Sequence, residues 1–448
     1  MSKQLFGTDG IRGVAGEYPL DGATIYAFGA ALGDAVRARE APEGSEVLVG
    51  ADTRESSAWI AELVAGGLAT RGVRTRYAGV ITTPGVAWLT RTGPFVAGVM
   101  ISASHNPYQD NGIKVFGHSG FKLPDAEEKE IEGEILRLRE NGAVPRPETL
   151  AADEGLDRQY LAYLASTASV RLDGARLALD GGNGAASLLA PELFRGLGAG
   201  VDAYSVEPNG RNINLHCGAL HVESLREKVV ACRQDFGVAF DGDADRAIFV
   251  ARSGKIVDGD AVLLLAARAL KAAGKLPGDV VVATVMSNLG LEKALEREGI
   301  RMVRTPVGDK YVLEEMVRLG AALGGEQSGH VIFREYATTG DGMLTALRVF
   351  EIARQAGAGL DELTADLRVF PQKLVNVRVR ERKQLTEIPS VAEEIRRVEE
   401  AFAGSGRVLV RFSGTEPLAR VMVEGPDQEQ VDAFSASIAE AIRREMGI

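Results

Sequence analysis

The chain has 448 residues, 45 % of them hydrophobic and 25 % charged, which is ordinary for a soluble globular protein. Its formal net charge of −11 argues against general nucleic-acid binding and means that an anionic substrate would need a locally basic pocket. The amino terminus has no apolar signal core and no apolar run approaches about 18 residues, so we expect a cytoplasmic protein outside the membrane. Cys217 and Cys232 lack CxxC spacing and suggest neither a disulfide framework nor a zinc site.

A pattern of strand, small-residue loop, helix and second strand occurs three times along the chain. Its first strands are EVLVG at residues 46–50, RLALD at 176–180 and DVVVAT at 279–284. Such alternation predicts βαβ units with mostly parallel sheets. Each repeat continues to an apolar run that ends in a polar, glycine-rich loop, at the sheet edge where open α/β domains bind ligands. These loops are ISASHNP at residues 101–107, DGDADR at 241–246 and GEQSGH at 325–330.

The last part of the chain has a different pattern. KLVNVRVRER and RVLVRFS alternate as strands on either side of a helix around residues 391–402. LARVMVEG follows as a strand, and residues 429–446 form a long amphipathic helix. We therefore predict three similar α/β domains with mixed or parallel sheets, followed by a small α+β domain. Their predicted ranges are residues 1–152, 153–254, 255–368 and 369–448.

The ISASHNP loop offers Ser102 and Ser104 beside His105. A serine needs an activator or a strong electrophile to act as a nucleophile. The alternative is a hydroxyl that completes a turn before the following Asn-Pro pair. We expect His105 to be a positioning or charge-neutralising donor, because nothing marks a partner carboxylate for a catalytic triad. Lys114, in NGIKVF, would on its own be taken for a surface lysine on a strand.

The DGDADR loop carries three carboxylates, on Asp241, Asp243 and Asp245, separated by Gly242 and Ala244. Small spacers let the backbone curl so that three oxygens can face one point. Two carboxylates about 4 Å apart repel by about 4 kcal/mol at an effective dielectric of about 20, so three together imply a cation. An EF-hand is excluded because its sixth position would be arginine instead of glycine, and oxygen-only ligation favours Mg²⁺. The alternative is a solvated acidic turn.

The GEQSGH loop places Glu326, Ser328 and His330 at alternate positions, so that all three point one way if the segment is extended. A carboxylate with a hydroxyl can recognise vicinal sugar hydroxyls or an amine. A polar loop with glycine hinges is the alternative.

The segment RFSGTEPLAR combines a glycine-containing turn with hydroxyl groups and two arginines. Such a turn is typical of a phosphate-binding nest, and an ordinary hairpin is the alternative. The candidate ligand groups are Arg411, Ser413, the amides of Gly414 and Thr415, and Arg420.

In this order the motifs resemble those of the α-D-phosphohexomutase superfamily, most closely its bacterial branch that acts on glucosamine phosphate. The resemblance spans the chain, from FGTDGIRG at residues 6–13 through ISASHNP, NGIKVF, DGDADR, TPVGDKYV and GEQSGH to RFSGTEP. It implies four domains around a central cleft, the first three of similar fold. One departure is Ala244, where the family usually has glycine. We therefore expect that this position does not need a positive φ.

The resemblance also implies roles for single residues. Ser104 would carry the phosphoryl group, and the three aspartates would hold one Mg²⁺ with an oxygen of the Ser104 phosphate as a further ligand. Lys114 and Arg246 would be the acid/base and charge-stabilising groups. Glu326 and Ser328 would bind sugar hydroxyls, and the RFSGTEPLAR segment would bind the phosphate that is not reacting. The full set of substrate-binding candidates is Arg12, His105, Glu326, Ser328, His330, Arg411, Ser413, Gly414, Thr415 and Arg420.

The implied reaction interconverts glucosamine 6-phosphate and glucosamine 1-phosphate, which feeds UDP-N-acetylglucosamine and cell-wall precursor synthesis. Phospho-Ser104 gives its phosphoryl group to one end of the sugar, the bisphosphate turns over, and Ser104 recovers the other phosphate. A sugar bisphosphate would serve as primer. The alternatives are a phosphomannomutase or phosphoglucomutase with the same mechanism, a Mg²⁺-dependent sugar phosphatase, and a non-catalytic sugar-phosphate sensor. A homodimer is possible.

Overall fold

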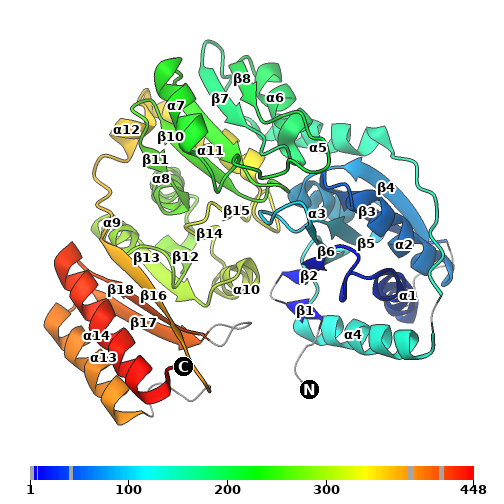
Figure 1. Ribbon diagram of the computed structural model, residues 1–448. Helices are drawn as coiled ribbons and strands as arrows, with labels where there is room; N and C mark the ends of the chain where they lie inside the picture. Colours follow the sequence, from blue (N-terminus) through cyan, green and yellow to red (C-terminus); the bar gives the residue numbers. More distant parts are fainter. Residues whose placement is uncertain (1–4, 8, 40–43, 143, 382–387, 413–417) are drawn as a thin grey trace. The chain divides into compact units, whose positions relative to one another are not determined.

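The computed structural model describes residues 5–7, 9–39, 44–142, 144–381, 388–412 and 418–448. The chain forms two compact units (Figure 1). The first comprises residues 1–286 and 300–365, and the second comprises residues 287–299 and 366–448.

The first sheet of unit 1 has six strands in the order β1-β2-β6-β5-β3-β4. Strand β3 pairs in parallel with β4 and β5, whereas β6 runs antiparallel to both β5 and β2. The strands are β1 (Phe6–Gly7), β2 (Gly10–Val14), β3 (Glu46–Ala51), β4 (Arg74–Val80), β5 (Phe95–Ile101) and β6 (Asp110–Gly117).

Two further sheets of unit 1 repeat the central part of the first. Each has a first strand parallel to a second and a third, and the third forms an antiparallel pair with a fourth. The matching orders are β4-β3-β5-β6, β8-β7-β9-β10 and β13-β12-β14-β15. The predicted α/β repeat is therefore confirmed, with mixed sheets. The added strands are β7 (Arg176–Asp180), β8 (Gly200–Tyr204), β9 (Phe236–Phe240), β10 (Ala247–Ala251), β11 (Ile256–Val257), β12 (Val280–Thr284), β13 (Arg301–Thr305), β14 (Leu323–Gly325) and β15 (Val331–Phe333).

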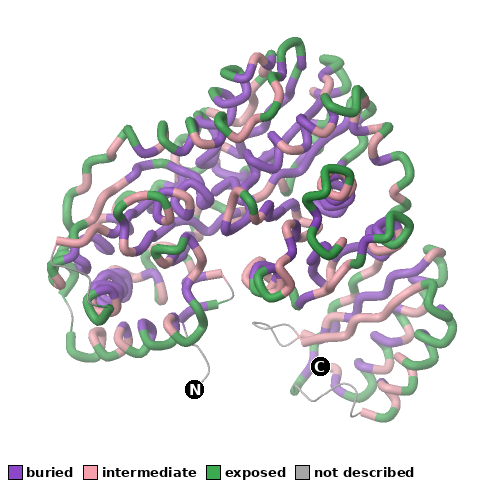
Figure 2. The backbone as a smooth tube through the Cα atoms, turned by 180° about the vertical axis from the view of Figure 1, so that it is seen from behind, coloured by how far each residue is buried: buried purple, intermediate pink, exposed green. Residues whose placement is uncertain are grey.

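The central strands of these sheets are buried on both faces, as Figure 2 shows by their purple tubes. Every residue of β9 (FGVAF) and of β12 (VVVAT) is buried. Strands covered on both faces have continuous apolar sequences instead of alternating ones, because neither row of side chains meets water. The apolar runs therefore anchor the polar loops that follow them.

Helices α1 and α2 pack closely in the first domain because glycines line their contact. A Cβ atom added at Gly29 would lie 2.2 Å from the carbonyl oxygen of Val64, and one at Gly67 would lie 2.3 Å from that of Tyr26. The helices of unit 1 are α1 (Gly22–Ala38), α2 (Ser57–Ala69), α3 (Thr83–Thr92), α4 (Asp125–Glu140), α5 (Glu154–Thr167), α6 (Ala186–Gly196), α7 (Glu223–Ala231), α8 (Gly259–Ala272), α10 (Asp309–Leu319), α11 (Gly342–Ala356) and α12 (Leu360–Leu363), with the 3₁₀ turn η1 (Pro277–Asp279).

Unit 2 is built on an antiparallel sheet in which β18 lies between β16 and β17. The β-α-β-β-α order predicted for this region is confirmed, and its core includes Val391, Phe402 and Ile438. Glu424 of β18 is fully buried and accepts a 2.8 Å hydrogen bond from the amide of Leu289, which joins α9 to the sheet. The elements are α9 (Leu289–Arg297), β16 (Gln372–Arg378), α13 (Pro389–Phe402), β17 (Arg407–Phe412), β18 (Leu418–Glu424) and α14 (Gln428–Met446).

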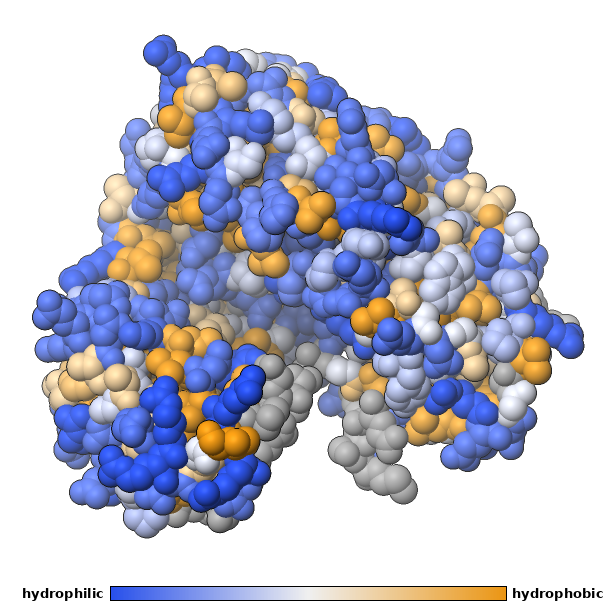
Figure 3. Space-filling model, viewed as in Figure 1, coloured by the Kyte–Doolittle hydropathy of each residue, from blue (hydrophilic) through white to orange (hydrophobic). Residues whose placement is uncertain are grey.

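The surface seen in Figure 3 is mainly hydrophilic, with apolar residues scattered over it. Among the helices of the described residues, none has the length and apolarity needed to cross a membrane.

Asp341 is the N-cap of α11 and links this helix to α5. Its carboxylate accepts hydrogen bonds from the amide of Leu344 at 2.9 Å and from the hydroxyl of Tyr160 at 2.7 Å. The side chain is buried, and this burial raises its pKa from 3.8 to about 6, although the two hydrogen bonds act in the opposite direction. A carboxyl group with a raised pKa stabilises the fold below its unfolded pKa, and this stability is lost as the pH rises through the folded pKa.

We expect Asp341→Asn to remove a pH-dependent part of the unfolding free energy. Asparagine caps helices as well as aspartate does and does not titrate. Between pH 4 and pH 7.5 the difference in unfolding free energy should therefore move by about 2.4 kcal/mol in favour of the variant. Urea unfolding across this range measures the difference.

Asp21→Asn at the N-cap of α1 is the matched control. Partial burial raises the pKa of Asp21, but the hydrogen bonds from Thr24 and the charge of Arg139 outweigh it and lower the pKa. The pH dependence of this control should have the opposite sign. If the difference in unfolding free energy between Asp341→Asn and the wild type does not change with pH, the capping carboxyl group is not the source of the pH dependence.

Candidate active site

Three predicted loops occupy equivalent places in the three repeated sheets. ISASHNP joins β5 to β6, DGDADR joins β9 to β10, and GEQSGH joins β14 to β15. Each loop thus lies between the third strand and its antiparallel fourth strand. The shared topology explains why loops of unrelated sequence recur at one position.

Ser104 is buried, at 1 % exposure, and has φ 52°, a left-handed conformation that is uncommon for a residue other than glycine. Its hydroxyl donates a 2.6 Å hydrogen bond to Oδ2 of Asp241. The two loops are therefore in direct contact through this serine. Ser102 is engaged elsewhere, since its hydroxyl donates to Oδ2 of Asp52 at 2.6 Å and accepts from the amide of Ser104 at 2.9 Å.

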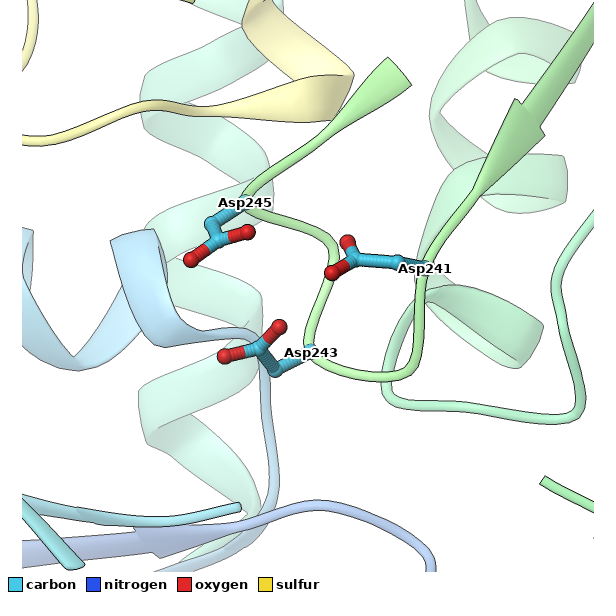
Figure 4. Close-up of side chains that lie close together, drawn as sticks. All are labelled: Asp241, Asp243 and Asp245. Carbon is cyan, nitrogen blue, oxygen red and sulfur yellow. The ribbon is translucent and has the colours of Figure 1, made fainter. Parts of the chain in front are cut away.

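Asp241, Asp243 and Asp245 are all buried, and one ligand oxygen from each lies within 4.8 Å of the others. Figure 4 shows the three carboxylates around the β9–β10 loop. No other cluster of metal-ligating side chains was found among the described residues. The Oδ1 atoms of Asp243 and Asp245 are buried without a hydrogen-bond partner. Orphaned carboxylate oxygens in a buried, oxygen-only set fit a hard divalent cation such as Mg²⁺.

Lys114 balances part of this negative charge. Its Nζ lies 2.8 Å from Oδ2 of Asp243, 3.3 Å from Oδ2 of Asp245 and 3.2 Å from Oδ2 of Asp9, and the side chain is 1 % exposed. Burial lowers the pKa of Lys114, but the three carboxylates outweigh this and raise it well above its usual value. The ammonium is therefore protonated at neutral pH. The sequence did not reveal that this strand lysine is fully buried.

The pKa values of Asp241 and Asp243 are shifted in opposite directions. Burial raises the pKa of Asp241 well above its usual value, and the charges of Asp245 and Asp243 raise it further. Burial also acts to raise the pKa of Asp243, but the ion pair with Lys114 and a 2.5 Å hydrogen bond from the Thr83 hydroxyl lower it. Asp241 therefore holds a proton more readily than Asp243 does.

Arg246 follows the triad directly. Its amide donates to Oδ1 of Asp241 at 3.1 Å, and its Nε lies 3.8 Å from Oδ1 of Asp245. Burial lowers the pKa of Arg246, but the charges of Asp241 and Asp245 outweigh this and raise it. This guanidinium is thus a permanent cation at the edge of the carboxylate cluster.

The expectation for Ala244 is wrong. This residue has φ 56° and is fully buried, so the loop does adopt a left-handed backbone there. Such a conformation costs an L-residue about 1–2 kcal/mol. Its amide donates to the carbonyl of Asp241 at 3.0 Å and its own carbonyl accepts from the amide of Gly342 at 2.9 Å, and these bonds hold the turn.

His105 lies beside the serine, with its Nδ1 3.2 Å from the Ser104 hydroxyl. Burial lowers the pKa of His105 to about 4, together with the charges of Arg246 and Arg12. The imidazole is therefore neutral at neutral pH, so it does not supply the positive charge that the sequence suggested for it. Because the single hydroxyl proton of Ser104 serves the shorter bond to Asp241, the Nδ1–H of His105 is left to donate to the serine oxygen.

A chain of charges that sequence reasoning missed runs from this cluster to the third domain. Asp9 binds Arg12, Lys114 and Lys122, and Lys122 also binds Asp309 at 2.5 Å. Burial acts to raise the pKa of Asp9, but the three cations around it lower it well below its usual value. Asp9 and Asp309 lie within the FGTDGIRG and TPVGDKYV motifs, but their contact through Lys122 had no signal in the sequence.

The GEQSGH loop is a tight turn, so the condition for its three polar side chains to point one way, an extended backbone, is not met. The amide of Glu326 bonds to the carbonyl of His330 at 2.8 Å, and Gly329 has φ 93°. His330 is 2 % exposed, and its Nε2 accepts a 3.1 Å hydrogen bond from the amide of Gly340. Glu326 accepts from the amide of Gly308 at 3.2 Å, and the Ser328 hydroxyl is buried without a partner.

The fourth motif belongs to unit 2. Arg411 of β17 and Arg420 of β18 are direct cross-strand partners. Like charges at such positions repel each other across a sheet. Burial and the charge of Arg420 lower the pKa of Arg411. The other predicted ligands, Ser413, Gly414 and Thr415, lie outside the described residues.

Comparison with known proteins identifies relatives along the whole chain. Residues 3–142, 158–254, 258–370 and 374–441 match, in this order, the phosphoglucomutase/phosphomannomutase alpha/beta/alpha domains I, II and III and C-terminal domain. A protein of Solibacter usitatus named phosphoglucosamine mutase is 74 % identical over 448 residues, which cover 100 % of both chains.

Two crystal structures share the fold. A phosphoglucomutase/phosphomannomutase family protein from Burkholderia thailandensis has a TM-score of 0.79 at 23 % identity, covering 98 % of this chain and 99 % of that one. The Aspergillus fumigatus N-acetylphosphoglucosamine mutase in complex with GlcNAc-6P and magnesium has a TM-score of 0.64 at 18 % identity, covering 99 % and 96 %. With four domain matches in order and a relative this similar over its full length, the chain belongs to the phosphoglucosamine mutase family of the α-D-phosphohexomutase superfamily.

Proposed function

We propose that this chain interconverts glucosamine 6-phosphate and glucosamine 1-phosphate through a phosphoserine enzyme and a sugar bisphosphate. The observation that carries the proposal is the 2.6 Å hydrogen bond between the Ser104 hydroxyl and Asp241, which supports Ser104 as the nucleophile beside a buried triad of aspartates. The similarity to a protein named phosphoglucosamine mutase supports glucosamine as the sugar.

Asp241, Asp243 and Asp245 would hold one Mg²⁺, because their orphaned oxygens match what this ion requires. When bound, the ion supplies positive charge to the phosphoryl oxygens, which is the main catalytic need in phosphoryl transfer. The Aspergillus relative described above contains magnesium and a sugar phosphate, in agreement with this assignment.

In the forward step, the bond between Oγ of phospho-Ser104 and phosphorus breaks as a sugar hydroxyl oxygen bonds to the same phosphorus. Overall, the hydroxyl proton of the sugar replaces the phosphoryl group on the serine oxygen, and any proton that Lys114 donates to that oxygen is restored from the sugar hydroxyl. Since Lys114 is protonated, it would supply positive charge and a proton at the serine side of the transfer. Arg246 would stabilise charge on the moving group, because a guanidinium does not give up its proton. In the second step the same events run in reverse from the other end of the sugar.

The remaining candidates would bind the sugar and its second phosphate. Glu326 and Ser328 are partly buried polar residues on the third-domain turn and would bind sugar hydroxyls or the amine. His330 would support the turn from its buried side, because its ring accepts a hydrogen bond from the amide of Gly340. Arg12 lies near Asp9 and would contact the substrate. Arg411, Arg420, Ser413, Gly414 and Thr415 would bind the phosphate that is not reacting.

Three other functions give different assay results. A phosphomannomutase or phosphoglucomutase would prefer mannose or glucose phosphates in a side-by-side assay. A sugar phosphatase would release inorganic phosphate from phospho-Ser104, and a non-catalytic sensor would show no turnover. The need for a bisphosphate primer, a homodimeric state and a cytoplasmic location stay predictions.

We expect Ser104→Ala to lose mutase activity by at least about a thousandfold, because no other group can carry the phosphoryl between half-reactions. Intact-protein mass spectrometry after incubation with glucosamine 1,6-bisphosphate should show one added phosphate on the wild type and none on the variant. Ser102→Ala is the control and should still accept the phosphate. A phosphate that maps to Ser102 in the wild type would show that the assignment is wrong.

We expect Mg²⁺ to raise the melting temperature by mass action and to bind more weakly as the pH falls, because it must displace the proton that the raised pKa of Asp241 favours. Calorimetry in buffers of different ionisation enthalpy should detect proton release on binding. Asp243→Asn should weaken this binding at least tenfold, whereas Asp173→Asn, at an exposed ion pair, should not. Equal Mg²⁺ affinity in all three proteins would contradict the metal role.

We expect Arg411→Lys to weaken binding of both the 1-phosphate and the 6-phosphate, since a lysine cannot reproduce the guanidinium fork. The bisphosphate should then escape during its turn, so that progress curves decay unless bisphosphate is added. Arg407→Lys is the matched control on the same strand, where the arginine pairs with Glu424 at 2.5 Å. Sustained activity without primer, with only one substrate bound more weakly, would argue against a shared phosphate site.

A further inference from the structure

Arg54 is a buried arginine that the proposed reaction does not use. Its side chain is 0 % exposed and forms an ion pair with Asp52 at 2.8 Å. The other guanidinium nitrogens donate to backbone carbonyls of the β5–β6 connection that carries Ser104, here called the serine loop. Nη2 donates to the carbonyls of Ser104 and Asn106, each at 2.9 Å, and Nη1 donates to those of Pro107 and Asp110. One side chain therefore fixes four carbonyls across this loop.

Asp52 extends this network to the other side of Ser104. Besides Arg54, its carboxylate accepts the hydroxyls of Ser57 at 2.9 Å and Ser102 at 2.6 Å. Ser102 in turn accepts the amide of Ser104 at 2.9 Å. Both the amide and the carbonyl of Ser104 are thus held through the same buried ion pair.

A second donor comes from the other domain. The Nδ2 of Asn214 donates to the carbonyls of Ser104 at 2.9 Å and Asn106 at 3.1 Å. The β9–β10 loop that carries the three aspartates, here called the metal loop, approaches the same carbonyl. A Cβ atom added at Gly242 would lie 2.5 Å from the Ser104 oxygen. Arg54 and Asn214 therefore hold the serine loop from opposite domains where it meets the metal loop.

We propose that Arg54 and Asn214 are positioning residues that keep Ser104 in its left-handed conformation and its hydroxyl oxygen on the metal loop. At φ 52° the Ser104 backbone is strained, and such a conformation persists only where surrounding bonds hold it. The two donors to its carbonyl supply that constraint. Neither residue is placed to react, because both bind backbone oxygens. The inference rests on the proposed role of Ser104 as phosphoryl carrier.

The first test is Arg54→Lys, which keeps the charge opposite Asp52 but cannot reach four carbonyls with one planar fork. We expect kcat for glucosamine 6-phosphate to fall by about tenfold to a hundredfold, the usual effect of misplacing a reacting atom, with KM and Mg²⁺ affinity within about twofold of wild type. Arg71→Lys is the control, because Arg71 pairs with Asp34 at 2.7 Å on the surface of the same domain.

The second test is Asn214→Asp, which preserves volume but removes both donated hydrogen bonds. It should lower kcat in the same way, whereas Asn209→Asp, at an exposed position in the same connection, should not. This variant decides the question if Arg54→Lys does not fold. For each protein, Ser104 is first charged with bisphosphate, and single-turnover transfer to the sugar is then followed by mass spectrometry.

Slow transfer from fully phosphorylated variants, with unchanged KM, is the expected result. Wild-type transfer rates accompanied only by a lower melting temperature would reduce both residues to a structural role and overturn the proposal. A KM increase that accounts for the whole loss would also overturn it, since it would mean contact with substrate. A wild-type protein that never carries phosphate on Ser104 would instead refute the proposed function itself.

Discussion

Three carboxylates forced together in a buried loop are the constraint on which the rest of this site depends. Each pair about 4 Å apart repels by about 4 kcal/mol at an effective dielectric of about 20, so the cluster must be neutralised locally. Lys114 meets Asp243 and Asp245, the Ser104 hydroxyl donates to Asp241, and Arg246 adds a second cation. The serine, the lysine and the arginine are therefore brought to one place by the same electrostatic need.

The ends of buried strands were the part of the fold that the sequence predicted well. Continuous apolar runs such as FGVAF can only be strands covered on both faces, and the polar loop after such a run must lie at the sheet edge. This reasoning located all three loops of unit 1. The strands that carry Arg411 and Arg420 were also predicted, and the structure pairs these two residues directly across β17 and β18. The sequence pattern was sufficient to predict those features that depend on contacts between residues close together in the chain.

Features set by distant contacts were not predictable in this way. The left-handed conformation of Ala244 depends on a bond from Gly342, about a hundred residues away along the chain. The turn at GEQSGH depends on the pairing of β14 with β15, which overrides the extended alternation. Arg54 gave no signal, because a lone arginine after a strand has the same sequence pattern whether it faces solvent or the carbonyls of another loop.

If Ser104 carries the phosphoryl group and the triad holds Mg²⁺, as proposed, formal charge would link the two. The acids of the cluster and its extension are Asp9, Asp241, Asp243, Asp245 and Asp309, and the cations are Arg12, Lys114, Lys122 and Arg246. If all five acids are ionised, one negative charge is left uncompensated, which fits the raised pKa of Asp241. A phosphate dianion on the serine alone would add two further negative charges to a buried site, which is costly. A divalent cation alone would turn the one negative charge in excess into one positive charge in excess. On the proposed roles of Ser104 and the triad, each load would therefore favour the other, and the buried charge pattern would couple phosphorylation to metal binding.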